Sequence, residues 1–186
     1  MRAFVAVVPP DTARAELAAA VTPLRSAHPE LRWTPAAQWH LTLVFLGEVD
    51  EGALPELSER LGRAAHRHAP MALALGGAGR FGDRVLWTRV REQPTPAGAG
   101  LRRLAAAVTA AARRCGLGLE DRAYRPHLTI ARSRGGTDLR PLVAQLSGFA
   151  GTPWAADALH LVRSRLGAGP GGTAAHDVLQ TWSLAR

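Results

Sequence analysis

The chain contains no lysine. All 23 of its basic side chains are arginines, and 15 acidic residues leave a formal net charge of +8. A GC-rich genome encodes Ala-, Arg- and Gly-rich chains of this kind. An anionic ligand such as RNA is the other explanation, because a guanidinium group binds phosphate through two parallel hydrogen bonds. Charge alone does not separate these explanations, so it gives only modest support for a polyanionic partner.

Cysteine and long apolar runs are also scarce. Cys115 is the single cysteine, so no intramolecular disulfide can form. No apolar run approaches the roughly 20 residues needed to span a bilayer. Residues 1–10 carry one basic residue and too short an apolar stretch for a signal peptide. We therefore expect a cytoplasmic, monomeric protein with no membrane contact and no implied protein partner.

Several catalytic signatures are missing. No G-x-S-x-G turn indicates a serine hydrolase, and no G-x-x-x-x-G-K-[ST] loop indicates nucleoside triphosphate hydrolysis. A metal site needs three or four ligands, usually with Cys, Asp or Glu among them. The histidine motifs of this chain have no adjacent carboxylate. We therefore predict no metal and no cofactor.

The most informative feature present is a repeated tetrapeptide. His-Leu-Thr-Leu starts at His40, and His-Leu-Thr-Ile starts at His127. Each copy lies in an apolar run that predicts a buried strand. Side chains alternate faces along a strand, so His40 shares a face with Thr42 and His127 with Thr129, each pair about 7 Å apart. A lone copy is most often structural, but a repeat at half-chain spacing indicates two similar halves.

If the polar faces of the two strands turn toward each other, they create a site with two imidazoles and two hydroxyls. Hydrolysis of a cyclic phosphate needs a base for the attacking water and an acid for the departing oxygen. An unperturbed histidine pKa of about 6.5 lets one imidazole be neutral and the other charged near pH 7. The threonine hydroxyls are suited to donate to the phosphate oxygens as charge develops. His40, Thr42, His127 and Thr129 are therefore the predicted catalytic residues, with the two histidine roles interchangeable at this point.

Three residues near the motifs are candidates for substrate binding: Arg125, Arg132 and Phe45. Arg125 has the strand parity of His127, whereas Arg132 has the opposite parity and needs a kink to reach the site. A solvated arginine at a strand end is the equally weighted alternative for both. The aromatic ring of Phe45, just after the first motif, completes the set.

Hydrophobic periodicity predicts alternating strands and helices. Strands are expected over residues 2–8, 31–34, 40–47, 71–75, 85–90, 127–132, 158–166 and 177–184, and helices over residues 11–26, 50–68, 101–115 and 138–147. Gly-rich residues 76–82 are expected to link two strands, residues 94–100 to form a loop and residues 167–172 a turn. The order lacks the strict parallel alternation of a doubly wound sheet and favours an α+β fold with helices outside. We expect one bilobal domain over residues 1–186, its lobes meeting near 94–100 and sharing a cleft, with the terminal strands crossing between them.

At these residues the sequence resembles the two-histidine phosphoesterase superfamily. Within it, the flanking segments resemble the bacterial and archaeal RNA 2′,3′-cyclic phosphodiesterase branch, historically called 2′-5′ RNA ligase. The matching segments are residues 2–6, 31–33, 40–47, 124–132, 161–164 and 182–184. The resemblance implies a pseudo-twofold-symmetric α+β fold in which antiparallel sheets line a central cleft. One departure lies near residues 174–177, where relatives often carry Tyr and this chain has His176.

The resemblance also implies an activity without a metal. RNA 2′,3′-cyclic phosphate ends would be hydrolysed to 2′-phosphates, with His40 as proton donor to the leaving 3′ oxygen and His127 as the base that activates water. Reversible 2′-5′ ligation, or cleavage of another cyclic phosphate at the same site, is an alternative. A catalytically silent RNA-binding module is a third, although retention of both histidines and both threonines argues against it.

Overall fold

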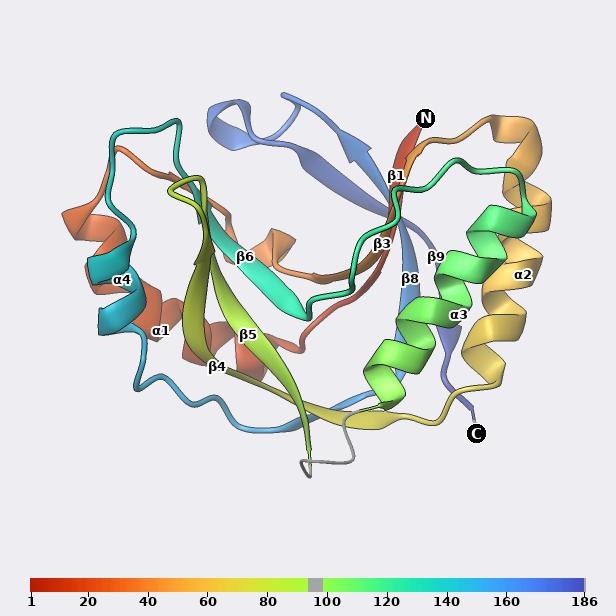
Figure 1. The fold of residues 1–186 in the computed structure, drawn as a ribbon, viewed down its shortest axis with the longest axis horizontal. Coiled ribbons are helices and arrows are strands. Elements are labelled where there is room, and N and C mark those ends of the chain that lie inside the picture. The colour runs from red at the N-terminus through yellow and green to blue at the C-terminus, as the bar shows by residue number, and fades with distance from the viewer. Residues whose placement is uncertain (94–98, 186) are drawn as a thin grey trace.

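The protein is an α+β fold built on one antiparallel sheet, seen in a computed structural model that describes residues 1–93 and 99–185 (Figure 1). The sheet order is β7-β4-β5-β6-β3-β1-β8-β9, with β2 paired to β6. The strands are β1 (Arg2–Val7), β2 (Arg32–Trp33), β3 (Leu41–Glu48), β4 (Met71–Phe81), β5 (Val85–Gln93), β6 (His127–Arg132), β7 (Trp154–Ala156), β8 (Ala158–Arg165) and β9 (Ala175–Ser183). The helices are α1 (Asp11–Ala27), α2 (Leu54–His66), α3 (Gly100–Arg114) and α4 (Arg140–Gln145), with short 3₁₀ turns η1 (Ala36–Gln38), η2 (Glu51–Ala53) and η3 (Pro170–Gly172). The predicted α+β class is confirmed.

The strand order is symmetric about its centre. The two motif strands β3 and β6 are neighbours, joined by the antiparallel pair Leu41–Leu128. Outward from them lie β1 and β5, then β8 and β4, then β9 and β7. Strands β8 and β9, late in the chain, extend the half that contains β1, whereas β4 extends the half that contains β5. Each half of the sheet is thus assembled from both halves of the chain.

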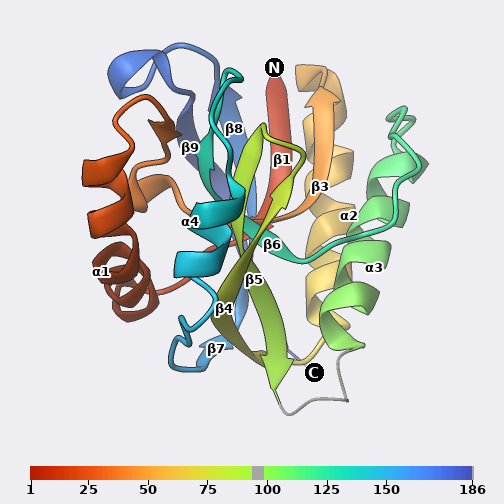
Figure 2. The same ribbon diagram turned by 60° about the vertical axis from the view of Figure 1, so that its left-hand side comes forward.

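The helices cover the two halves of the sheet in pairs. Helices α1 and α4 pack beside β4, and helices α2 and α3 pack against β9 and β3 (Figures 1 and 2). Their buried residues recur every three or four positions, which gives each helix one apolar side. For α2 these are Leu57, Leu61, Gly62, Ala64 and Ala65, and for α3 they are Leu101, Leu104, Ala105, Val108, Ala111 and Ala112.

The two motif strands bury one face and leave the other open. Leu41 and Leu43 of β3, and Leu128 and Ile130 of β6, are buried in the core. The threonines that alternate with them are half-buried. Because side chains alternate along a strand, the aliphatic residues face the helices and the motif histidines and threonines lie on the opposite face.

The Gly-rich stretch is a strand, so the prediction that residues 76–82 link two strands is wrong. Strand β4 runs to Phe81 and pairs with β5 through a bulge between Gly76 and Gly79. A side chain at Gly79 would overlap the indole of Trp87 on the neighbouring strand. Glycine is therefore used here for close approach, and the segment that the sequence suggested as a turn is part of a bulged strand.

Smaller differences concern element ends. Strand β7 was not predicted, helix α4 is shorter than residues 138–147, and the expected helix over 50–68 begins with the 3₁₀ turn η2. The expected loop over 94–100 falls largely on residues 94–98, outside the described residues, and Gly100 already belongs to α3. Among the described residues, no helix combines the length and apolar character required to cross a membrane.

Candidate active site

The sheet brings the four motif side chains together. Continuing the Leu41–Leu128 register by one residue each way sets His40 across from Thr129, and Thr42 across from His127. The four positions form a quadrilateral about 7 Å along the strands and about 5 Å across them. The histidines occupy one diagonal and the threonines the other. The strands were expected to face each other, but they lie side by side in one curled sheet, and the site lies on the face opposite the helices.

Both histidines are held by the same hydrogen bond. His40 Nδ1 donates to the Gln38 carbonyl oxygen at 2.8 Å, and His127 Nδ1 donates to the Arg125 carbonyl oxygen at 2.7 Å. A carbonyl only accepts, so Nδ1 carries the proton in each ring and Nε2 is left for a ligand. The backbone two residues before each histidine therefore sets its tautomer and orientation.

His40 lies in an aromatic environment. Its ring stacks on Phe4 with centroids 4.5 Å apart and meets the edge of His176 at 5.1 Å. Burial lowers the pKa of His40 to about 4, although the hydrogen bond to Gln38 opposes this, and the positive charges of nearby basic groups lower it further. The His176 Nδ1 atom is buried and has no hydrogen-bond partner among the described residues.

His127 lies between different aromatic rings. The edge of Phe81 meets it at a centroid distance of 4.9 Å, and Trp87 lies at 5.9 Å. Burial also lowers the pKa of His127; the hydrogen bond to Arg125 opposes this shift and the charge of Arg132 adds to it. Both imidazoles are therefore neutral near pH 7 in the free protein.

A bulge at the last residue of each motif changes which face of the sheet the following side chains occupy. The pairing of β6 with β5 skips Ile130, and the pairing of β3 with β1 skips Leu43. A bulge shifts the alternation by one residue, so Arg132 and Phe45 return to the side of the histidines. The ring of Phe45 is 63% exposed and lies 6.1 Å from that of Phe4. Arg132 has the opposite strand parity to His127, and the bulge in β6 is the kink that brings it to the same face.

Arg132 is electrostatically coupled to both histidines. Its positive charge contributes to the lowered pKa of His40 and of His127. Burial, followed by the charge of Arg32, lowers the pKa of Arg132 itself. Arg32 and Arg132 are cross-strand partners in the β2–β6 pair. Two adjacent guanidinium groups repel each other unless an anion lies between them, which makes this edge of the site suited to phosphate.

Arg125 enters the site through its main chain. Its carbonyl oxygen accepts the hydrogen bond that orients His127, and its side chain is exposed just before β6. Contact between the Arg125 guanidinium group and the substrate stays a prediction.

Several residues of the site were missed by the sequence analysis. They share no motif, and only strand register or long-range contact places them: Phe4, Arg32, Phe81, Trp87 and, as a neighbour of His40, His176. The hints in the sequence were the departure from the family pattern at His176 and the matching segments 2–6 and 31–33, which contain Phe4 and Arg32.

Metal ligands do not gather at this face or elsewhere in residues 1–93 and 99–185. Those residues contain no group of three or more His, Cys, Asp or Glu side chains placed to hold a metal ion. Metal-independent chemistry stays a prediction and needs a direct test.

Comparisons with known proteins agree with this architecture. RNA 2′,3′-cyclic phosphodiesterase of Thermus thermophilus is 34% identical over 178 residues, which cover 89% of this chain and 83% of the relative. The enzyme of the same name from Geobacillus stearothermophilus is 32% identical over 146 residues, covering 76% of this chain but only 45% of the relative. The aligned region thus spans less than half of that longer protein.

Solved structures show the same fold. The crystal structure of TT0787 of Thermus thermophilus matches with a TM-score of 0.81 at 31% identity, covering 99% of this chain and 98% of that one. Escherichia coli LigT in apo form matches with a TM-score of 0.75 at 26% identity, covering 100% of this chain and 98% of that one. The model of the 2′-5′ RNA ligase superfamily matches residues 9–168, most of the chain. By sequence and by fold, this chain belongs to the 2′-5′ RNA ligase superfamily.

Proposed function

We propose that this protein hydrolyses RNA 2′,3′-cyclic phosphate ends to 2′-phosphomonoesters by acid–base catalysis with two histidines. The observation that carries the proposal is the diagonal arrangement of His40 and His127, each with Nδ1 bound to a carbonyl and Nε2 free. A phosphorus atom above the quadrilateral would have an imidazole on either side. Relatives of this chain are named RNA 2′,3′-cyclic phosphodiesterase, and hydrolysis of a cyclic phosphate needs an acid and a base at phosphorus.

The reaction is one displacement at phosphorus. His127 Nε2 takes a proton from water, whose oxygen attacks phosphorus on one side. The bond from phosphorus to O3′ breaks on the other side, and His40 Nε2 gives O3′ the proton that it needs. The product is a 2′-phosphate beside a 3′-hydroxyl. The assignment of acid to His40 follows family resemblance.

The phosphate oxygens are stabilised by groups beside the histidines. Thr42 and Thr129, on the other diagonal, donate hydrogen bonds to the non-bridging oxygens as their charge increases. Arg132 neutralises part of that charge, and the arrangement of Arg32 opposite it strengthens the local positive potential. These contacts replace the role that a metal ion has in other phosphoesterases.

His40 must acquire its proton with the substrate. Its pKa of about 4 leaves it neutral in the free protein near pH 7. A phosphodiester anion close to Nε2 favours the charged imidazolium and raises this pKa. Substrate binding is therefore coupled to proton uptake by the acid.

The nucleoside is proposed to contact Phe45. The exposed ring stands on the histidine face, beside Phe4, and unstacked RNA bases bind aromatic rings in this way. Arg125 is proposed to contact a neighbouring phosphate. We further propose that residues 1–186 act as one bilobal unit, a monomer in the cytoplasm that requires no cofactor.

The decisive experiment is product analysis on a 2′,3′-cyclic mononucleotide and on an RNA with that end. Phosphorus NMR distinguishes the 2′-phosphate from the 3′-phosphate. A 2′-phosphate formed by the wild type and not by His40→Ala supports the proposal. A 3′-phosphate product would contradict the proposed cleavage of the bond to O3′. Ligation without hydrolysis, or RNA binding with no turnover, would replace the proposal by one of the alternatives.

A further inference from the structure

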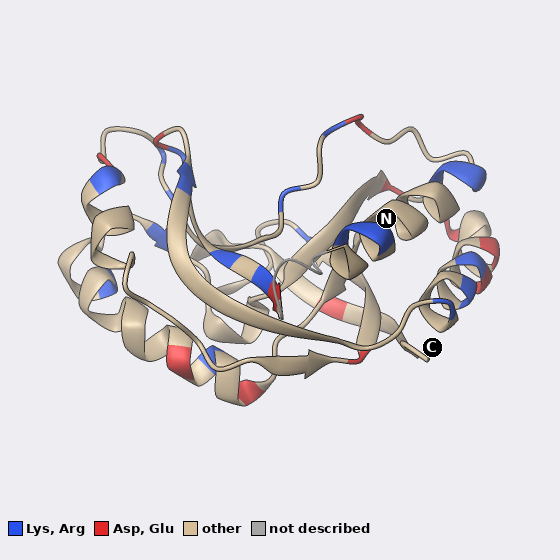
Figure 3. Ribbon diagram, turned by 60° about the horizontal axis from the view of Figure 1, so that its bottom comes forward, with Lys and Arg blue, Asp and Glu red and all other residues tan. Residues whose placement is uncertain are grey.

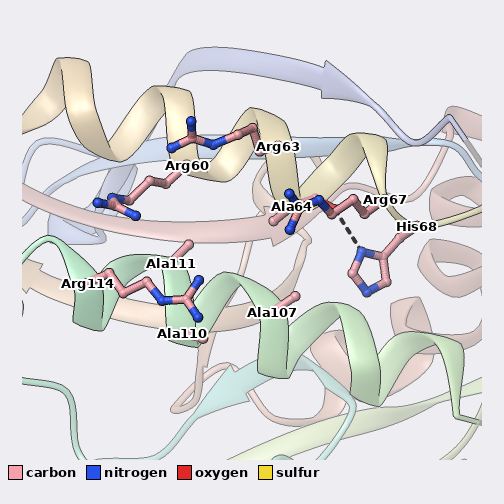
Figure 4. Close-up of a pocket in the computed structure, with 9 residues that line it drawn as sticks. All are labelled: Arg60, Arg63, Ala64, Arg67, His68, Ala107, Ala110, Ala111 and Arg114. Atoms are coloured by element: carbon pink, nitrogen blue, oxygen red, sulfur yellow. Dashed lines mark hydrogen bonds between the residues drawn. The ribbon is translucent and has the colours of Figure 1, made fainter.

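A second basic site lies away from the histidines, in a groove between α2 and α3. The groove has a volume of about 260 Å³ and is lined by Arg60, Arg63, Ala64, Arg67, His68, Ala107, Ala110, Ala111 and Arg114 (Figure 4). Among the described residues, the lining includes four arginines and one histidine but no Asp or Glu. Helix α2 carries acidic and basic residues together, whereas α3 carries basic residues and no acidic one (Figure 3). The groove is lined by basic residues of both helices.

Two of the guanidinium groups are already paired. Arg60 contacts Glu56 at 2.7 Å and Arg63 contacts Glu59 at 2.7 Å, both one turn back along α2. These exposed pairs stabilise the helix only weakly and are readily exchanged for a stronger anion. They hold the two side chains along the groove.

The other two are available. The guanidinium groups of Arg67 and Arg114 have no ion pair or hydrogen bond among the described residues. Arg67 directly follows α2, and Arg114 is the last residue of α3. Attraction to the helix C-termini accounts for basic residues at both helix ends. It does not account for Arg60, which lies before the last turn of α2 and lines the same groove as Arg114 (Figure 4).

The groove wall allows close approach. Four of its nine lining residues are alanines, so the helix surfaces between the guanidinium groups carry no bulk. At one end, His68 Nδ1 donates to the Ala64 carbonyl oxygen at 2.7 Å, which leaves Nε2 for a ligand. From residue 60 to residue 68 the groove extends about 12 Å along the helix axis, enough for more than one phosphate group.

We propose that this groove binds the phosphodiester backbone of single-stranded RNA whose cyclic phosphate end lies at the histidines. The inference rests on the proposed function. Helices α2 and α3 cover the opposite face of the sheet from the motif side chains, so the reacting nucleotide does not reach the groove. The nucleotides that do are several positions away, which makes the groove a length-dependent affinity site outside the chemistry. Guanidinium forks at the groove bind phosphate without reading sequence.

The test compares Arg67→Gln/Arg114→Gln with Arg25→Gln/Arg103→Gln, a control that removes the same charge from helix positions outside the groove. Binding is measured by fluorescence anisotropy on labelled RNAs of two and twelve nucleotides that end in a 2′-phosphate. We expect the groove variant to weaken binding of the longer RNA about 10-fold or more and to leave the dinucleotide unchanged. The slope of log affinity against log salt should fall in magnitude by about 1.4, or about 0.7 for each lost phosphate contact.

Activity on a cyclic mononucleotide separates this inference from the proposed function. If the wild type does not hydrolyse the mononucleotide, the proposed function fails irrespective of the groove. If it does, and the groove variant and the control bind the longer RNA equally, the groove inference is overturned. Competition with tripolyphosphate shows whether the groove binds RNA phosphates or small polyphosphates. If the groove binds tripolyphosphate but its substitution does not change RNA affinity, it is a site for small polyphosphates. That result also overturns the groove inference.

Discussion

The two halves of the site hold their histidines alike but surround them differently. In both, Nδ1 is bound to the carbonyl oxygen two residues earlier. His40, however, is stacked on Phe4 and close to a third imidazole, whereas His127 has an edge-on contact with Phe81 and a tilted contact with Trp87. After the matching bulges, the first half presents Phe45 and the second Arg132. The shared backbone geometry thus sets the orientation of the two imidazoles. The different neighbours set the pKa of each imidazole and the side chains available to contact the substrate.

This difference bears on the roles of the histidines. In the free protein His40 has the strongly lowered pKa, which by itself favours a neutral base. Family resemblance makes it the acid. The two assignments are compatible only if the substrate phosphate raises the pKa of His40 more than that of His127. Variants of the two halves test this directly.

The largest effect is expected from the histidines. His40→Ala and His127→Ala should each lower kcat about 10²–10⁴-fold, because each removes an acid or a base. The two losses should not multiply in the double variant, since both groups act in one displacement. The wild-type rate should follow a bell-shaped pH curve, and each variant should lose one limb.

A substrate with an activated leaving group distinguishes the halves. Such a group needs little protonation, so it should rescue the acid variant, which is His40→Ala by the present assignment. Selective rescue of His127→Ala would exchange the roles. A flat pH profile with full activity in either variant would contradict the mechanism.

The threonine diagonal should show the next largest effect. Thr42→Ala and Thr129→Ala should each reduce turnover about 10- to 1,000-fold through loss of a donor to the developing charge. Thr42→Ser and Thr129→Ser keep the hydroxyl and serve as matched controls. Folding should change little, since the threonines lie on the open face. Wild-type turnover in both alanine variants would show that the residues only support the strands.

A substitution at Gly79 tests whether the packing of Trp87 positions His127. Gly79→Ala would place a methyl group against the Trp87 indole, which lies next to His127. Overpacking of this kind costs about 1–3 kcal/mol in the free energy of unfolding. The control is Gly118→Ala, where a Cβ meets nothing within 4 Å. Equal thermal stability and activity in both variants would show that the Trp87–Gly79 contact does not position the site.

The pH dependence of stability tests the burial of the histidines. The pKa of His40 is about 4 in the folded state and about 6.5 when unfolded, so between these values only the unfolded chain binds the proton. The free energy of unfolding should therefore fall as pH decreases from about 6.5 to about 4. Burial also lowers the pKa of His127, His160 and His176, which adds to the same trend.

Urea titrations at several pH values measure this slope. His40→Asn removes the titrating group and should flatten the dependence. Asp138, whose pKa its neighbour Arg140 lowers to about 2, titrates below this range and does not obscure it. A slope in His40→Asn as steep as that of the wild type would show that His40 is not buried as the structure has it.

The smallest effect is expected from metal removal. Two imidazoles, two hydroxyls and guanidinium groups supply the whole proposed chemistry, so excess EDTA should leave turnover of a cyclic nucleotide unchanged. Activity lost with EDTA and restored by zinc or manganese would replace the two-histidine mechanism by a metal-dependent one.

The sequence predicted the positions of most helices and strands, but it did not predict where one strand is bulged or where a short strand forms. Alternating apolar residues identified β3 and β6, and helical spacing identified α1, α2 and α3 within a few residues. The stretch of residues 76–82 was misassigned, because glycines are typical of turns. Nothing local in the sequence reveals that the Trp87 indole on the neighbouring strand requires a glycine at position 79. The short strand β7 escaped notice for a similar reason: it forms through pairing with β4 and has little pattern of its own.

By itself, the sequence determined which catalytic groups this protein has. The His-x-Thr motif occurs twice, and strand alternation puts the His and Thr of each copy on one face. The family resemblance, which spans the chain, indicates the same groups. Tertiary structure decided where that chemistry lies. Strand pairing placed His40 and His127 on one diagonal, and bulges returned Phe45 and Arg132 to the same face. Long-range packing brought Phe4 and Trp87 against the imidazoles. The physical reason is that alternation along a strand is local, whereas register, bulges and burial arise from contacts between segments distant in the chain.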